Sequence, residues 1–125
     1  MTAEGGGLRW MGEQAVVTVP AEIDATNAGE VRQALLAAAG QDAAVLIIDM
    51  SGTTFCDSAG VQAIIATYNQ AAAADIQLRL VATAVLRILT LVGVDQLVPI
   101  YPTLEAALAG TPTAAASARD PDDPG

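Results

Sequence analysis

The sequence predicts an α/β fold, with a mixed, mostly parallel sheet of about five strands and four helices. Apolar segments with helical spacing alternate along the chain with short β-branched runs. Ala44 to Asp49 is a continuous apolar run, typical of a central strand that is buried on both faces. The chain has 125 residues, of which 53% are hydrophobic, so it is long enough for one domain and too apolar for global disorder.

The strands of this sheet are expected where β-branched or alternating residues lie between turn signals. The expected strands are 8–11, 15–19, 44–49, 77–81 and 97–101. Gly12 and Glu13 predict a turn, so the first two strands should pair as an antiparallel hairpin, and Pro20 ends the second. Trp10 is expected to pack on the first strand.

Four helices follow from apolar residues at helical spacing and from capping signals. They are residues 26–39, a helix after Asp57 with Val61, Ile64, Ile65, Tyr68 and Ala72 on one face, a helix bearing Val85, Ile88, Leu89 and Val92, and residues 104–109. Thr26 or Asn27 should cap the first helix, Thr83 the third and Thr103 the last. Gly40 and Gly93 should end the first and third helices.

The composition predicts one domain followed by a tail, and the net charge disfavours some classes of binding partner. Residues 1–110 form the expected domain, and residues 111–125, with several Pro and Asp and no apolar period, predict a disordered acidic tail. Fourteen acidic residues face five basic ones, giving a net charge of −9, which disfavours binding to nucleic acid and to anionic membranes. No apolar stretch suggests a signal peptide or a membrane span, so a cytoplasmic protein is expected.

The sequence offers little for catalysis. It contains no His and one Cys, which rules out a Ser-His-Asp or Cys-His arrangement and an internal disulfide. Gly52, Gly60 and Gly93 form no phosphate-binding loop pattern. Cys56 lies beside Asp57, whose charge disfavours a thiolate, so we expect a small loop or core residue. A non-enzymatic protein without cofactor or metal is expected.

Three acidic residues near element ends leave an alternative open. Asp24, Asp49 and Asp57 could together hold Mg²⁺, or two of them could act as an acid pair in hydrolysis. The other interpretation is that these carboxylates serve as helix caps and soluble loop residues. We favour this second interpretation, because neither chemical signal is specific.

The most informative segment is Asp57-Ser58-Ala59-Gly60, which joins the loop after the buried strand to the second helix. Asp57 or Ser58 at the N-cap would satisfy free backbone N–H groups. A helix N-terminus also favours negative charge, so a phosphoryl group on Ser58 would be held there. The sequence therefore suggests both a structural cap and a phosphoacceptor.

Four segments in register resemble the anti-sigma-factor antagonists, the single-domain bacterial members of the STAS family. They are Glu22-Ile23-Asp24, Leu46 to Ser51 with Phe55, Asp57 to Gly60, and Val85 to Leu89 with Gly93-Val94. The resemblance covers roughly residues 8–109. It implies a STAS-like fold and a switch rather than a catalyst.

In that family, the unphosphorylated antagonist binds an anti-sigma factor that is also a serine kinase, and the sigma factor is released. The resemblance implies that this kinase phosphorylates Ser58, which dissociates the complex, and that a phosphatase of the PP2C type resets it. Asp24, Asp57 and Gly60 match the neighbours of the phosphosite. The implied partner-binding residues are Glu22, Asp24, Ser58, Ala59, Val61 and Gln62.

This sequence departs from the family pattern at three places. Pro20-Ala21 replaces the usual Gly before Glu22, Ala59 replaces a hydroxyl residue, and Val61-Gln62 replaces Leu-Gly. None of these changes removes Ser58. A STAS domain that acts as a scaffold or ligand-sensing module in another signalling assembly is the alternative.

Overall fold

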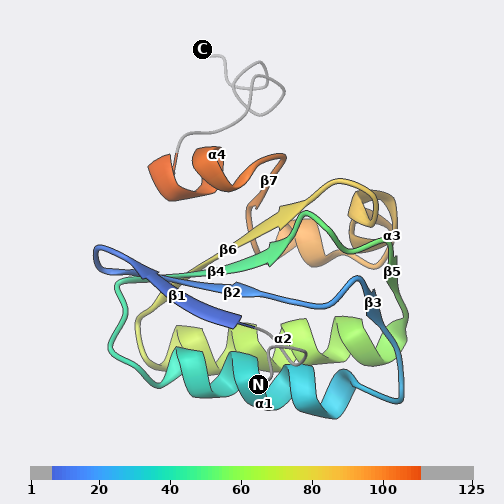
Figure 1. The fold of residues 1–125 in the computed structure, drawn as a ribbon, viewed down its shortest axis with the longest axis horizontal. Helices are drawn as coiled ribbons and strands as arrows, with labels where there is room; N and C mark the ends of the chain where they lie inside the picture. The colour runs from blue at the N-terminus through green and yellow to red at the C-terminus, as the bar shows by residue number, and fades with distance from the viewer. Residues whose placement is uncertain (1–6, 111–125) are drawn as a thin grey trace.

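The computed structural model describes residues 7–110 as a sheet with two helices on one face and a short helix on the other (Figure 1). The strands are β1 (Gly7–Met11), β2 (Gln14–Thr18), β3 (Glu22–Ile23), β4 (Val45–Met50), β5 (Phe55–Cys56), β6 (Gln77–Ala82) and β7 (Ile100–Tyr101). The helices are α1 (Ala28–Ala39), α2 (Ser58–Ala73), α3 (Leu86–Leu91) and α4 (Leu104–Ala109), with a 3₁₀ turn at Val94–Gln96.

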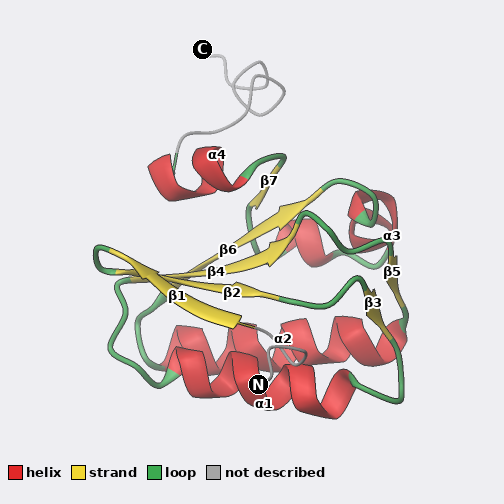
Figure 2. Cartoon of the chain, in the orientation of Figure 1, coloured by secondary structure: helices red, strands yellow, loops and turns green. Residues whose placement is uncertain are grey.

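The main sheet has five strands in the order β1-β2-β4-β6-β7. Only β1 and β2 are antiparallel, and the other neighbours are parallel. Helices α1 and α2 connect parallel strands and cover the same face of the sheet, whereas α4 covers the opposite face (Figure 2). The predicted α/β class, with a mixed sheet of five strands and four helices, is confirmed.

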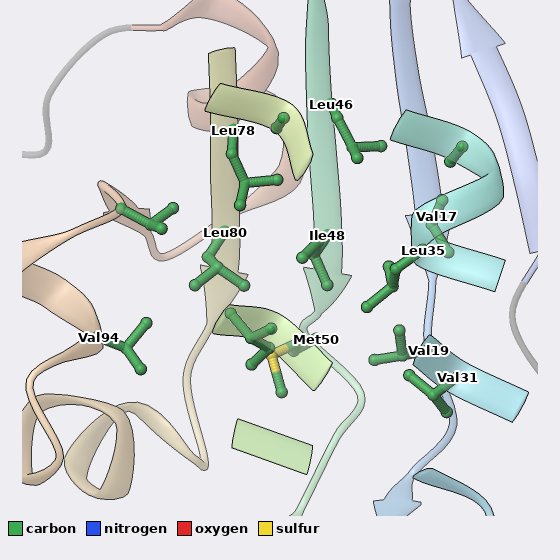
Figure 3. Packing of buried hydrophobic residues seen from close by; sticks show 14 of the residues in the cluster. Val17, Val19, Val31, Leu35, Leu46, Ile48, Met50, Leu78, Leu80 and Val94 are labelled. Atoms are coloured by element: carbon green, nitrogen blue, oxygen red, sulfur yellow. The ribbon is translucent and has the colours of Figure 1, made fainter. Parts of the chain in front are cut away.

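Successive side chains of a strand point to opposite faces of the sheet, so the strands contribute to two separate apolar cores. Leu46, Ile48 and Met50 of β4 face α1 and α2, and their core includes Leu35 and Leu80 (Figure 3). Residues Val45 and Ile47 of β4 face the other way, toward a smaller core that α4 closes with Ala107. Every residue of β4 is buried, which confirms the predicted central strand.

The third helix differs from its prediction. Thr83 does not cap α3, whose N-cap position is Val85 with no side-chain hydrogen bond. Ile88 and Val92 are 39% and 52% exposed, because α3 has only six residues and turns one residue, Leu89, fully inward. Gly93 does follow the helix, with a φ of 87° that favours glycine.

Four further predictions need correction. The last strand is confined to Ile100–Tyr101, because only this part pairs with β6. Trp10 is 45% exposed, since β1 is an edge strand that the helices leave partly uncovered. Ala72 is exposed on α2. Asn27 lies at the N-cap position of α1, but its side chain bonds elsewhere.

Two further predictions concern the C-terminal tail and membrane-spanning segments. The predicted tail, residues 111–125, lies outside the described residues. Within residues 7–110, none of the helices combines the length and the hydropathy that crossing a bilayer requires.

Candidate functional site

A second, two-stranded sheet builds the site. The two-residue strands β3 and β5 pair in parallel, with Glu22 opposite Phe55 and Ile23 opposite Cys56. The pairing continues where the backbone N–H of Asp57 donates to the carbonyl of Ile23 at 3.1 Å. Asp24 and Asp57 each follow directly after these strands, so the pairing brings the Glu22–Asp24 segment beside the start of α2.

Ser58 is the first residue of α2, and its side chain is exposed. The carboxylate of Asp57 accepts hydrogen bonds from the backbone N–H groups of Ala59 at 2.9 Å and Gly60 at 3.3 Å. Asp57 is thus the N-cap, which resolves the choice between Asp57 and Ser58. The hydroxyl of Ser58 is not used as a cap and faces solvent at the positive end of the helix.

Asp24 is held in a small polar loop. Its Oδ1 accepts hydrogen bonds from the hydroxyl of Thr26 and from the backbone N–H of Thr26, the latter at 2.9 Å. The side-chain bond from Thr26, followed by the backbone bond, lowers the pKa of Asp24 below its usual value. Asp24 therefore carries a negative charge at neutral pH.

Asn27 fixes this loop from the other side. Its Oδ1 accepts from the backbone N–H of Asp24 at 3.0 Å, and its Nδ2 donates to the carbonyl of Glu22 at 2.8 Å. Sequence reasoning assigned Asn27 to helix capping and missed this contact. The signal in the sequence was the Asn side chain itself, which carries both a hydrogen-bond donor and an acceptor.

Gly60 allows α2 to begin close to the small sheet. A Cβ at this position would lie 2.5 Å from the Sγ of Cys56 and 2.9 Å from the Cγ2 of Ile23. Neither distance is possible without movement of the neighbours. Gly60 is therefore a packing requirement of the site, not a surface contact.

Cys56 is a core residue, as predicted, and is 3% exposed. Burial and, to a lesser extent, the charge of Asp57 together raise the pKa of its thiol to about 11. A thiolate is therefore scarce at neutral pH, and the chemistry of a reactive cysteine is disfavoured.

Thr53 is a second residue that sequence reasoning missed. It is fully buried, and its hydroxyl donates to the carbonyl of Pro20 at 2.8 Å. The backbone N–H of Thr54 donates to the carbonyl of Ala21 at 2.8 Å. These bonds join the two loops that precede β3 and β5, so they help to set the position of Asp24 relative to Ser58.

Asp49 lies apart from this loop cluster. It is buried at the end of β4, accepts from the backbone N–H of Ser51 at 3.0 Å, and pairs with Arg9 at 3.8 Å. In the described part of the chain, no three His, Cys, Asp or Glu side chains form a group that could hold a metal ion. The shared site for Asp24, Asp49 and Asp57 is therefore not supported.

The predicted partner-binding residues do not all reach the surface. Glu22, Ser58 and Gln62 are exposed, whereas Asp24 and Ala59 are half-buried. Val61 is only 7% exposed and packs in the main core, so it offers little contact area. The surface around Ser58 thus combines an acidic loop with the first exposed turn of α2.

Comparisons with known proteins agree with this architecture. The STAS domain family model matches residues 11–107. An anti-sigma factor antagonist from Mycobacterium paratuberculosis is 32% identical, with a TM-score of 0.78; the match covers 84% of this chain and 91% of that one. A search of the curated proteins gives no match.

Two solved forms of SpoIIAA share the fold, and the phosphorylated one is described as the Bacillus cell fate determinant. The unphosphorylated form, described as an anti-sigma factor antagonist, is 19% identical with a TM-score of 0.69, covering 84% of this chain and 94% of that one. The phosphorylated form is 19% identical with a TM-score of 0.64, covering 84% and 97%. The chain belongs to the STAS domain family, and its structural neighbours include proteins described as anti-sigma factor antagonists.

Proposed function

We propose that this protein is an anti-sigma-factor antagonist whose partner is an anti-sigma factor that is also a serine kinase. In its unphosphorylated form it binds this partner, and the sigma factor is released. Phosphorylation of Ser58 ends the binding, and a phosphatase of the PP2C type restores it. The 32% identity with the mycobacterial antagonist, over nearly the whole domain, supports this assignment.

The observation that carries the proposal is the placement of Ser58. Its side chain is exposed at the first position of α2, while Asp57 already satisfies the N–H groups of Ala59 and Gly60. The Ser58 hydroxyl can therefore change its chemistry without removing the cap. A kinase would transfer the γ-phosphoryl group of ATP to its Oγ, releasing ADP and the hydroxyl proton.

The charge of the site supports a switch that acts through repulsion. A phosphoryl group adds about −1.5 to −2 charge. It would lie close to Asp57 and to the Glu22–Asp24 loop, where the Asp24 carboxylate is already ionised. The chain has a net charge of −9, so the modified surface would be strongly anionic. We propose that a partner adapted to the unmodified surface loses both contact and electrostatic fit.

The first experiment tests the phosphoacceptor. Incubation with the cognate kinase and ATP should add one phosphoryl group to the wild-type protein and none to Ser58→Ala, as measured by intact mass. Ser51→Ala is the matched control, because Ser51 is also exposed, in the loop directly after β4. Equal modification of Ser58→Ala and the wild type would contradict the assignment.

The same samples test whether the switch acts at the surface. Ser58→Ala should keep partner binding, and Ser58→Asp should weaken it less than phosphorylation does, because it adds a smaller charge on a shorter group. Repulsion should soften as the Debye length falls from about 10 Å at 0.1 M salt to about 3 Å at 1 M. Amide shift changes spread through the sheet would show a conformational switch instead.

The alternative role, a scaffold or ligand sensor in another assembly, predicts different results. A protein of that kind would bind no anti-sigma factor in either form. We place the antagonist in the cytoplasm with its partner kinase, and propose no catalytic activity, cofactor, nucleic-acid ligand or membrane ligand. An absence of binding to the anti-sigma factor, in both the phosphorylated and the unphosphorylated form, would favour the alternative.

A further inference from the structure

A groove runs between the first halves of α1 and α2 and begins beside the Ser58 site. The two helices lie side by side under the sheet (Figure 2). The groove has a volume of about 380 Å³ and is lined by Ala28, Gly29, Arg32, Ala59, Gln62, Ala63 and Ala66. Because Ala59 directly follows Ser58, the groove and the phosphoacceptor share one surface.

The walls of the groove are short side chains, apart from Arg32 and Gln62. A Cβ placed on Gly29 would meet nothing within 4 Å, so this wall faces open space. The groove can therefore admit a narrow aliphatic stem between the helices. It is too poor in large apolar side chains to act as a purely hydrophobic pocket.

Arg32 supplies the one charged group of the lining. Its side chain is exposed, and within residues 7–110 it forms neither a salt bridge nor a side-chain hydrogen bond. Two other arginines are engaged, because Arg9 pairs with Asp49 and Arg79 donates to the carbonyl of Ala107 at 2.6 Å. Arg87 on α3 is exposed and, among the described residues, has no such contact, but it lies outside the groove. A guanidinium with free donors presents a fork that fits a carboxylate.

We propose that this groove receives an aspartate or glutamate side chain of the anti-sigma factor, with its stem between the helices and its carboxylate on Arg32. The inference rests on the proposed function and adds the charge of the partner. The partner would carry basic groups opposite Glu22 and Asp24, and an acidic group opposite Arg32.

This arrangement of charges favours one orientation of the bound partner. Acidic groups lie on the β3 side of Ser58 and the cation lies on the α1 side. A partner docked with reversed polarity would place like charges together at both ends, which costs affinity. Arg32 thus acts as a specificity determinant that distinguishes the cognate anti-sigma factor from others.

The experiment measures affinity by calorimetry between the unphosphorylated protein and the anti-sigma factor, chosen from those of the source organism, that binds the wild type. Arg32→Gln should weaken binding about tenfold and Arg32→Glu about a hundredfold, as expected for loss and reversal of one charged contact. Gly29→Leu should also weaken it at least about tenfold, because the new side chain fills the groove.

Matched controls separate the groove from general effects. Arg87→Gln makes the same change in charge on α3, outside the groove, and Ala37→Leu adds the same side chain at an exposed position of α1. Both should bind within about twofold of the wild type. Thermal unfolding should show that all variants fold, since each changed residue is exposed.

Three results would overturn the inference. If Arg32→Gln and Gly29→Leu both bind the anti-sigma factor as tightly as the wild type does, the groove is not used. The proposed function would still stand in that case, because the wild type binds. Failure of the wild type to bind any of these anti-sigma factors would overturn both proposals. If sedimentation shows that the wild type self-associates and that Arg32→Gln does not, the occupant of the groove is a second copy of this chain.

Discussion

At the scale of single residues, the glycines near the helix starts have opposite roles. Gly60 lies in the first turn of α2, where a Cβ would overlap Cys56 and Ile23. Gly29 lies in the first turn of α1, where a Cβ would meet open space. Gly60 is thus required for packing at the start of α2, whereas Gly29 only adds a cost in backbone entropy to α1.

This contrast gives a paired prediction. Gly60→Ala should destabilise the protein by about 1–3 kcal/mol, because Cys56 and Ile23 must move. Gly29→Ala should leave the free energy of unfolding unchanged or raise it by up to about 1 kcal/mol, because Ala has the higher helix propensity. Urea denaturation of the two variants measures both values. Equal effects would contradict the proposed packing role of Gly60.

The Cys56 thiol predicts a dependence of stability on pH. Burial and the charge of Asp57 raise its folded-state pKa from the ordinary 9.0 to about 11, so the unfolded chain releases this proton first as pH rises. The contribution is therefore fully present below pH 9 and is lost between about pH 9 and 11. Urea denaturation across this range should show the loss in the wild type, and Cys56→Ala should lose less stability over the same interval.

At the scale of elements, the start of α2 depends on one side chain. Asp57→Ala should cost about 1 kcal/mol of unfolding free energy, because the N–H groups of Ala59 and Gly60 lose their acceptor. Asp57→Asn should retain most of the stability, since an amide oxygen also caps. Chemical denaturation of both variants checks this, and equal losses would show that the charge matters more than the cap.

At the scale of the whole molecule, α4 closes the smaller core, and the chain continues beyond it. Residues 111–125 have no periodic apolar face, so their deletion should change the melting temperature by less than about 4 °C. Deletion of residues 104–125 should lower it much further, because Ala107 is fully buried against the sheet. Calorimetry of the two truncations tests this. A large loss from the shorter deletion would contradict it.

The sequence by itself determined the features that depend on neighbouring residues. The continuous apolar run predicted β4, and Thr103 caps α4 as predicted, accepting from the N–H of Ala106 at 3.1 Å. It also predicted that Ser58 lies at the start of a helix. These signals lie within a few residues of the structure that they specify, because caps and periodic faces are local properties.

Only the tertiary structure decided which loops meet. The strands β3 and β5 have two residues each, too few for a periodic pattern, and they pair across more than thirty residues of sequence. The same holds for the exposure of Trp10 and the burial of Val61, which depend on which helix covers which part of the sheet. Distant segments specify these contacts through their packing, so no short stretch of the sequence contains them.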